Sequence, residues 1–341
     1  MHVMGGGDVG GAKTQIMNTV TGLSRTNDVM LISFRAGPFA DEARERGIDV
    51  RVIERHNPFR AARTMRDLVD EFKPDIIHCH GGRANLMGAM VRRSRRIPII
   101  TTVHSDYRLD YLGSPLKQHT LGTANAIALR FLDFYQPVAD RMARTLIERG
   151  FDPERIVKIY NGMEFNRPEG EFDRAAYLRE TYGAEIEEGD VLCGIAARLT
   201  AVKDIATTVR GFAEALKTAP QLRLFIAGDG EDADMLKKLC DQLGVRERVT
   251  FCGWVSPVMP FFRAMDINLL SSVSETFPYS ILEGVCAGCA TICSDVGGMP
   301  ELIDTGENGY IFPVGDHKKL AEYMARLAND AALRHTFAEA L

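Results

Sequence analysis

The strongest constraint on the fold is an alternation of short apolar runs and helical patterns that occurs twice along the 341 residues. One series occupies residues 1–160, and a second begins at Val191 and continues to about Asn329. Strands that alternate with helices in this way are typical of a parallel sheet with helices on both faces. We therefore expect an α/β protein of two Rossmann-like domains that face each other across a cleft, where ligands of such folds bind.

The stretch between the two series is polar and rich in Glu, and it follows the turn signal Asn161-Gly162. It predicts a domain boundary, with one domain over residues 1–162 and the other over residues 163–341. The expected strands are 1–4, 29–34, 50–53, 75–78, 98–103, 136–138 and 156–160, then 191–197, 222–227, 249–252, 267–270, 290–293 and 310–312. The expected helices are 12–25, 60–72 and 85–95, then 205–216, 232–243, 258–264 and 318–329.

Composition narrows the class of protein. An odd number of cysteines, seven in all, does not suit a secreted disulfide framework, so we expect a cytoplasmic protein. No apolar run approaches the ~18 residues that span a bilayer. Lys and Arg exceed Asp and Glu only in the first half, which carries the short basic run Arg92 to Arg96. This run is either a solvated helix end or a patch for peripheral contact with anionic membrane lipid. No nucleic-acid-binding module is visible.

The stretch Ser272 to Val285 places two carboxylates around the start of a helix. Pro278 suits the first helical position, so the N–H groups near 279–281 are expected to form an anion site strengthened by the helix dipole. Glu283 lies roughly 7 Å further along the helix, a distance that suits a ribose attached to a bound phosphate. Glu275 stays on the preceding loop. The pattern predicts a ligand with hydroxyls at both ends and phosphate between them, which describes a nucleotide diphosphate-sugar.

Three further positions are candidates for ligand contact. Arg198 and Lys203 follow the first strand of the second series, where they either neutralise a diphosphate or form a solvated loop pair. His104 ends a strand of the first series and is the best candidate for a contact to the reacting sugar. His78 and His80 come next, but no carboxylate or cysteine completes a metal-binding set with them, so no metal is expected.

Two motifs suggest a cofactor or cluster site, but each has a simpler structural or ligand-binding explanation. Gly5-x-Gly7-x-x-Gly10 matches the dinucleotide fingerprint, yet the next strand lacks the acidic residue that binds a ribose and runs into Arg35 instead. The alternative is that Gly10 and Gly11 bring backbone amides close to a diphosphate or sugar. Cys286, Cys289 and Cys293 suit a helix that runs into a buried strand better than a redox or cluster site.

Together these residues resemble the retaining GT-B glycosyltransferases of the large group-1 (family 4) class, over almost the whole chain. The resemblance is carried by a set of short motifs. They are Gly10-Gly11, His104, Ile159-Tyr-Asn-Gly162, Ala197-Arg198-Leu-x-x-x-Lys203, Gly228-Asp-Gly-Glu231, Phe251-Cys-Gly-Trp254, Glu275-x7-Glu283 and Ser294-Asp-Val-Gly-Gly-Met-Pro-Glu301.

The resemblance implies sugar transfer with retention from a UDP- or GDP-linked donor to a glycan or lipid-linked acceptor, with no cofactor and no required metal. The setting implied is cell-surface polysaccharide synthesis in the cytoplasm or at the inner face of the membrane. Arg198 and Lys203 would bind the diphosphate, Glu283 the ribose and Glu275 the transferred sugar. His104 and the Gly10-Gly11 loop would approach the sugar from the N-terminal domain, which takes the acceptor. Main chain near Trp254 and Val255 would contact the base, and the amides near Tyr279, Ser280 and Ile281 would bind the distal phosphate. Phe277 is a further donor-binding residue that the resemblance implies.

The chain departs from the family pattern at Thr276, where the family has Gly, and at 13–15, where it often has Glu-Arg. Its C-terminal pattern is still helical where the sequence stops. In the family a last helix commonly crosses back onto the first domain, and the pattern does not extend far enough to predict that helix. Two alternatives to the transferase therefore stay open at this point. One is a nucleotide-sugar epimerase, and the other is a non-catalytic nucleotide-sugar-binding subunit.

Overall fold

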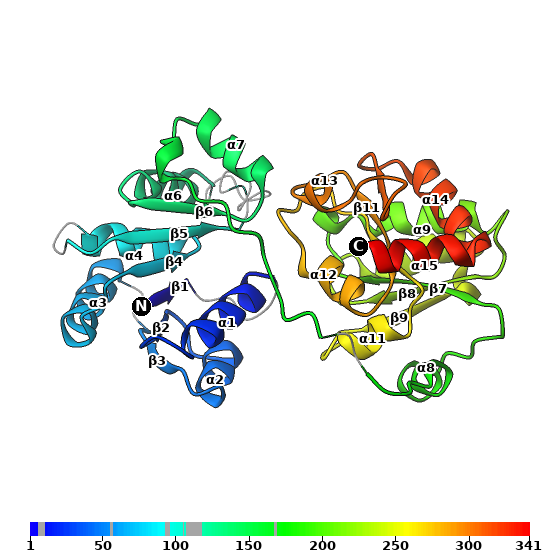
Figure 1. Ribbon diagram of the computed structural model, residues 1–341, viewed down its shortest axis with the longest axis horizontal. Helices are drawn as coiled ribbons and strands as arrows, with labels where there is room; N and C mark the ends of the chain where they lie inside the picture. Colours follow the sequence, from blue (N-terminus) through cyan, green and yellow to red (C-terminus); the bar gives the residue numbers. More distant parts are fainter. Residues whose placement is uncertain (6–10, 55–56, 93–95, 105, 107–117, 167–168) are drawn as a thin grey trace. The chain divides into compact units, whose positions relative to one another are not determined.

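The computed structural model describes residues 1–341 except 6–10, 55–56, 93–95, 105, 107–117 and 167–168. It divides into two compact units, Met1–Gly162 and Met163–Leu341 (Figure 1). Within the described residues each unit is built on a six-stranded parallel sheet, so the expected α/β class with two Rossmann-like domains is confirmed. No helix in the described part of the chain is long and apolar enough to cross a membrane.

The sheet of the N-terminal unit has the strand order β3-β2-β1-β4-β5-β6, which is the order of a Rossmann sheet. Its strands are β1 His2–Met4, β2 Met30–Ser33, β3 Asp49–Val52, β4 Ile77–His80, β5 Ile99–Val103 and β6 Phe134–Pro137. Its α-helices are α1 Gly11–Leu23, α2 Pro38–Glu45, α3 Pro58–Phe72, α4 Gly82–Arg92, α6 Thr123–Leu129 and α7 Asp140–Glu148, with a π-turn at Gln118–Gly122 and a 3₁₀ turn at Pro153–Arg155.

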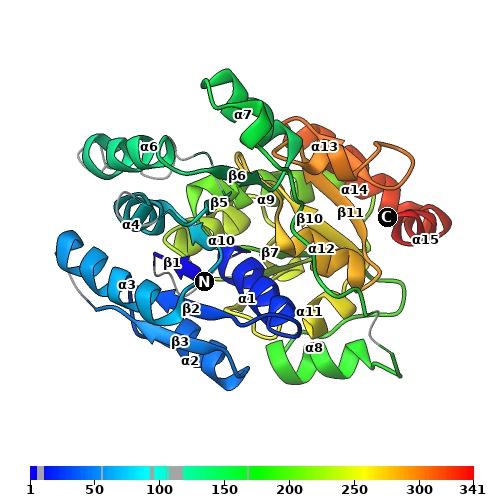
Figure 2. The ribbon, with the colours of Figure 1, turned by 60° about the vertical axis from the view of Figure 1, so that its left-hand side comes forward.

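Two apolar clusters fill the N-terminal unit, one on each face of the sheet. Side chains of α1 and α2 pack on one face of β1 and β2, and those of α3 and α4 pack on the other face of β1, β2 and β4. Figure 2 shows the same arrangement from a second direction. Because both faces are covered, the central strands β1, β2 and β4 are almost entirely buried, although β1 and β4 carry histidines.

The C-terminal unit repeats this plan with the order β12-β11-β10-β7-β8-β9, so β7 and β10 lie at its centre. Its strands are β7 Val191–Ala196, β8 Leu222–Ala227, β9 Val249–Gly253, β10 Ile267–Leu270, β11 Ala290–Ser294 and β12 Tyr310–Phe312. Its α-helices are α8 Arg174–Tyr182, α9 Ile205–Ala215, α10 Ala233–Gln242, α11 Met259–Arg263, α12 Tyr279–Cys286, α13 Met299–Leu302, α14 His317–Asn329 and α15 Ala331–Ala340, with 3₁₀ turns η3 Ala201–Lys203 and η4 Arg246–Arg248.

Two expectations about local structure are wrong. The segment 156–160 is not a strand; it makes one isolated bridge, between Tyr135 of β6 and Ile156, although Val157 and Ile159 donate to β6 carbonyls. Val157 and Ile159 are about half exposed, so no second partner extends the pairing. No helix was expected in the polar stretch 163–189, but it contains α8, in which Asp173 caps the first turn and Leu178 is buried.

Candidate functional site

The turn between β10 and α12 holds Glu275 in a fixed position. Ser272 Oγ donates a hydrogen bond of 2.7 Å to Glu275 Oε1, and Ser294 Oγ donates one of 2.7 Å to the carbonyl oxygen of Ser272. Lys203 Nζ forms an ion pair with the same Oε1. The side chains of Lys203 and Glu275 are only 21% and 12% exposed, so solvent screens this pair less than a surface pair.

Lys203 is itself held by main-chain bonds to the strand end that precedes Glu275. Ser271 Oγ donates to the carbonyl oxygen of Lys203 at 3.0 Å, and the amide of Val273 donates to the carbonyl oxygen of Val202 at 2.9 Å. Thr208 Oγ1 on α9 in turn donates to Ser271 Oγ at 2.8 Å. The cation and the carboxylate are therefore positioned by one continuous network at the carboxyl ends of β7 and β10.

Arg198 lies on the loop between β7 and η3, and its side chain is exposed. Two glycines hold this loop: a Cβ on Gly228 would lie 1.8 Å from the carbonyl oxygen of Ala197, and one on Gly230 would lie 2.3 Å from that of Leu199. Among the residues that the structure describes, the Arg198 guanidinium has no hydrogen bond or ion pair. A fixed loop thus presents a cation whose donors are available to a ligand.

Helix α12 begins at Tyr279, and Pro278 is its N-cap, one position before the first helical position expected for it. The side chains of Phe277, Tyr279 and Ile281 are buried, so these residues can offer a ligand only their main chain. The amide of Ile281 donates to the carbonyl oxygen of Pro278 at 3.3 Å, a long bond at the edge of the hydrogen-bonding range. The expected role of 279–281 in phosphate binding stays a prediction.

The start of α12 lies unusually close to β10. Asn268 Nδ2 of β10 donates to the carbonyl oxygen of Ser280 at 3.0 Å, and a Cβ on Gly284 would lie 2.1 Å from that nitrogen. Gly284 therefore allows a side chain of the central strand to tie the first turn of α12 to the sheet. This contact holds the N-terminal part of α12, the helix that carries Glu283, against β10.

Glu283 is a partly buried carboxyl on α12. Loss of solvation raises its pKa from 4.5 to about 7. Within the described residues its carboxylate accepts no hydrogen bond and forms no ion pair. Hydroxyl groups of a ligand would supply the donors that the ionised form lacks, so this position suits a sugar hydroxyl pair such as that of a ribose.

In the N-terminal unit, His104 follows directly after β5, and its Nε2 lies 3.3 Å from His80 Nδ1. Burial lowers the pKa of His104 to about 4, so the ring is neutral near pH 7. Gly11 is the first residue of α1, whereas Gly10 lies outside the described residues. Most of the glycine fingerprint, residues 6–10, lies outside them as well.

Trp254 and Val255 follow β9 and differ in burial. The Trp254 indole is 61% exposed, while Val255 packs against the core beside β8. An exposed aromatic ring suits stacking, although only main-chain contacts to a base were expected here. Cys286, Cys289 and Cys293 are free and buried, and Cys289 Sγ donates to the carbonyl oxygen of Phe262 at 3.2 Å. These thiols thus occupy core positions.

The sequence reasoning missed the residues that support the site. Ser271 was not singled out and Ser272 was named only as the start of a stretch, although two hydroxyls directly after an apolar strand signal a polar strand end. Gly297 was also missed: its φ is +53°, and a Cβ there would lie 2.3 Å from the carbonyl oxygen of Thr276. The signal was the pair Gly297-Gly298, which packs against the Glu275 turn.

Two protein families match the two units. The family described as Glycosyltransferase Family 4 matches residues 9–167, and that described as Glycosyl transferases group 1 matches residues 183–341. Similar proteins include an uncharacterized glycosyltransferase of Methanocaldococcus jannaschii, which is 29% identical over 71% of this chain and 63% of its own length. Another is the N-acetyl-alpha-D-glucosaminyl L-malate synthase of Bacillus anthracis, 27% identical over 82% of this chain and 71% of its own length.

A solved structure with the same fold is HepE of Anabaena in complex with UDP-glucose. It has a TM-score of 0.85 at 21% identity and covers all of this chain and 93% of its own. Sucrose-phosphate synthase of Thermosynechococcus elongatus matches with a TM-score of 0.80 at 17% identity, over 99% of this chain and 92% of its own. These similarities confirm the expected two-domain GT-B fold.

Proposed function

The chain belongs to the glycosyltransferases of group 1, and from this membership we propose that it transfers a sugar, with retention, from a nucleotide diphosphate-sugar to a glycan or lipid-linked acceptor. We expect UDP rather than GDP as the carrier, because the structural neighbour HepE is described with UDP and UDP-glucose. The transfer serves cell-surface polysaccharide synthesis. The family match favours transfer over the epimerase and the non-catalytic subunit.

The observation that carries this proposal is the arrangement of Lys203, Glu275 and Glu283 around the start of α12. Glu275 is held by Ser272 and by Lys203, while Glu283 stands alone further along the helix. In our proposal Glu283 accepts hydrogen bonds from the ribose and Glu275 binds hydroxyls of the transferred sugar. Lys203 lies beside Glu275, where it reaches the phosphate next to that sugar.

The diphosphate is the leaving group, and its negative charge grows as the bond to the sugar breaks. Arg198 and Lys203 stabilise that charge, so the reaction needs no metal ion. The amides of 279–281 add donors at the distal phosphate, Trp254 and Val255 hold the base, and His104 with the Gly10-Gly11 loop approaches the sugar.

Retention follows without an enzyme nucleophile in this proposal. A retaining hydrolase places two carboxyl groups ~5 Å apart on either side of the reacting carbon. Glu275 and Glu283 instead bind opposite ends of the donor. The acceptor hydroxyl therefore attacks from the face that the phosphate leaves, and the departing phosphate oxygen takes its proton. A covalent sugar adduct on Glu275 during turnover would refute this mechanism.

The acceptor places the reaction in the cytoplasm, at the inner face of the membrane where lipid-linked acceptors are exposed. Arg92, the last residue of α4, and Arg96 beyond it are both exposed. Arg92 pairs with Asp133, so Arg96, which has no ion pair among the described residues, supplies the charge for peripheral contact with anionic headgroups. Binding of the protein to vesicles that contain anionic lipid, compared with neutral vesicles, tests this contact. Equal binding to both vesicles would contradict it.

The test of the function begins with thermal shifts against UDP-, GDP- and ADP-linked sugars. A ligand at ~100 times its Kd stabilises a protein by about 2.7 kcal/mol, which is a measurable rise in Tm. The preferred donor is then incubated with an acceptor extract, and nucleoside diphosphate release and the anomeric configuration of the product are measured. Release that requires the extract supports transfer. An isomerised donor without acceptor, or binding without turnover, would overturn it.

A further inference from the structure

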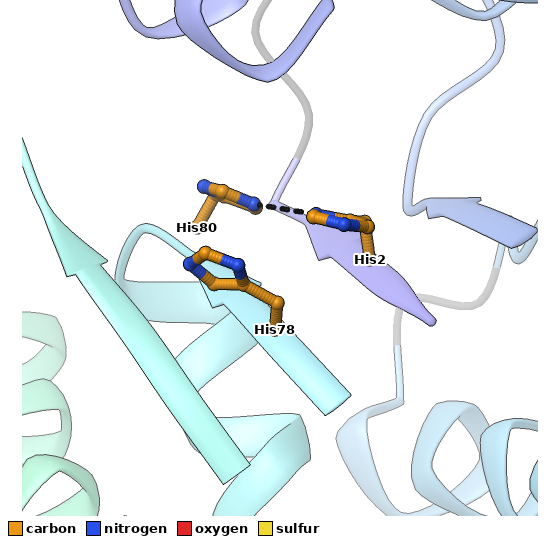
Figure 3. A group of neighbouring side chains, drawn as sticks. All are labelled: His2, His78 and His80. Atoms are coloured by element: carbon orange, nitrogen blue, oxygen red, sulfur yellow. Dashed lines mark hydrogen bonds between the residues drawn. The ribbon is translucent and has the colours of Figure 1, made fainter. Parts of the chain in front are cut away.

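Three histidines gather on one face of the N-terminal sheet. They are His2 of β1 with His78 and His80 of β4, and one ring nitrogen of each lies within 4.8 Å of the others (Figure 3). His2 Nδ1 and His80 Nε2 are 3.2 Å apart. Tetrahedral zinc with imidazole nitrogens at 2.0–2.1 Å separates neighbouring ligand atoms by about 3.4 Å, so this pair is close to the required spacing.

The register of β1 against β4 places His2 beside His78 and His80, the two histidines already recognised in the sequence. His2 is directly opposite His78 in the parallel pairing of β1 with β4, and side chains two apart on a strand share a face. Cys79, between the two histidines, points to the other face, because a Cβ on Gly88 of α4 would meet its Sγ. The set that looked incomplete in the sequence is completed by the second residue of the chain.

Two of the rings have a hydrogen-bond partner on the nitrogen that faces away from the group, while the inner nitrogens of His2 and His80 bond to each other, a bond that a bound ion would replace. His78 Nε2 bonds to Thr102 Oγ1 at 2.7 Å, which leaves its Nδ1 for the centre of the group. His80 Nδ1 lies 3.3 Å from His104 Nε2, which leaves its Nε2 facing His2. Metal-binding histidines almost always have such a partner on the nitrogen that does not bind the metal.

The cluster is also chemically ready to bind a cation. Imidazole is the commonest metal-binding side chain in proteins, and it binds in its neutral form. His2 and His80 are 5% and 3% exposed, so the surrounding protein excludes most competing water ligands.

We infer that His2 Nδ1, His78 Nδ1 and His80 Nε2 form a binding site for a divalent transition-metal ion, with Zn²⁺ the expected ion. Imidazole suits zinc, copper and nickel, and a three-histidine set leaves a fourth position for water. The His78 ring stacks on the His80 ring, with centroids 4.4 Å apart and planes 24° from parallel, so binding requires the His78 ring to turn until its Nδ1 lone pair points at the ion. The site joins β1 to β4 and does not depend on the donor or the acceptor, so its ion would be structural.

The experiment uses the whole chain without a histidine tag, stripped with a chelator and then titrated with Zn²⁺ alone in a calorimeter. We expect one tightly bound equivalent, which is lost in His78→Gln and in His80→Gln. His335→Gln, which changes a histidine of α15 outside the group, is the control and should keep the equivalent. Absence of saturable binding to the wild type, or binding unchanged in both cluster variants, would overturn the inference.

Two further measurements keep the test clear of folding effects. Zinc-edge X-ray absorption of the loaded wild-type protein should show three imidazole nitrogens at 2.0–2.1 Å; fewer than three would refute the site. Thr102→Val removes the bond to His78 and should weaken zinc binding about 10- to 100-fold. The matched control is Thr101→Val, which breaks a buried hydrogen bond to Asn85 rather than one to a histidine. Equal affinity of the two threonine variants would contradict the ligand role of His78.

Discussion

Lys203 and Glu275, 72 residues apart in the chain, form a partly buried ion pair whose carboxylate oxygen Oε1 also accepts from Ser272. The pair joins the end of β7 to the end of β10, the two central strands of the C-terminal sheet. In our proposal one partner binds phosphate and the other binds sugar. The pair therefore fixes the distance between the two halves of the donor, and changes to each partner should have different effects.

Lys203→Met should weaken UDP binding about 10- to 100-fold, because a hydrogen bond to a charged group contributes roughly 1.5–3 kcal/mol. Glu275→Gln has nearly the same shape as the wild type and removes the charge that faces the sugar. It should leave UDP affinity within about threefold and lower turnover of the nucleotide-sugar. Calorimetry with UDP and initial rates with the full donor separate the two effects. Equal losses of UDP affinity in both variants would contradict the division of roles.

The sequence predicted the central parts of the fold better than its edges. Strands β8, β10 and β12 begin and end where their apolar runs do, because burial on both faces selects mostly apolar residues; Arg223 in β8 and Asn268 in β10 are the exceptions. At the edge of the other sheet, the run 156–160 is just as apolar but finds a partner on one side only. Helix α8 was missed since its nine residues bury a single Leu178, too little for a recognisable pattern.

The site was predicted in its parts and not in its connections. Arg198, Lys203 and Glu275 carry charges on the segments that follow strands. Glu283 carries one on helix α12, and each of these residues could be recognised as a candidate by itself. Their pairing depends on which strands are neighbours in the sheet. The Lys203–Glu275 ion pair joins residues 72 apart, and the register of β1 against β4 adds His2 to the two histidines of β4. Both follow from the sheet topology and not from spacing along the chain.

Glu283→Gln tests the ribose assignment. A carboxylate accepts hydrogen bonds from two hydroxyls at once, whereas the amide offers one acceptor oxygen. We expect UDP affinity to fall about tenfold or more, since hydrogen bonds to a charged group are worth about 1.5–3 kcal/mol. The sharper measurement compares UDP with its 2′-deoxy analogue. The wild type should prefer UDP, and the preference should shrink toward unity in the variant; an unchanged preference would place the ribose elsewhere.

The raised pKa of Glu283 predicts how stability depends on pH. The folded protein holds this proton up to about pH 7, while the unfolded chain releases it near 4.5. Between these values the native state binds more protons, so the free energy of unfolding should fall as pH rises, by roughly 3 kcal/mol in total. Denaturant unfolding of wild type and Glu283→Gln at pH 5 and pH 8 gives the difference due to this group alone. At pH 8 the free energy of unfolding of the variant should rise relative to that of the wild type, compared with the difference at pH 5. No such rise would mean that the Glu283 carboxyl is solvated in the folded protein.

The contact between Gly297 and the Glu275 turn gives the last prediction. The Gly297 φ of +53° disfavours other residues, and an added Cβ would lie 2.3 Å from the carbonyl oxygen of Thr276 and 2.5 Å from that of Glu275. Gly315 is the matched control, because its φ is +78° and nothing lies within 4 Å of an added Cβ. Gly315→Ala should cost about 1–2 kcal/mol from backbone strain alone. Gly297→Ala should cost about 1–3 kcal/mol more, because the added methyl overlaps main chain that cannot rotate away.

The same pair of variants should differ in activity, since only Gly297 touches the turn that carries Glu275. The amide of Gly298 donates to the carbonyl oxygen of Thr276 at 2.7 Å, so a shift at 297 moves the turn with it. Turnover should fall in Gly297→Ala, measured below the Tm of each protein, and stay near wild type in Gly315→Ala. UDP affinity should fall less than turnover in Gly297→Ala, because Arg198 and Lys203, which bind the diphosphate in our proposal, lie outside this turn. Equal turnover in the two variants would show that the position of Glu275 does not limit the reaction.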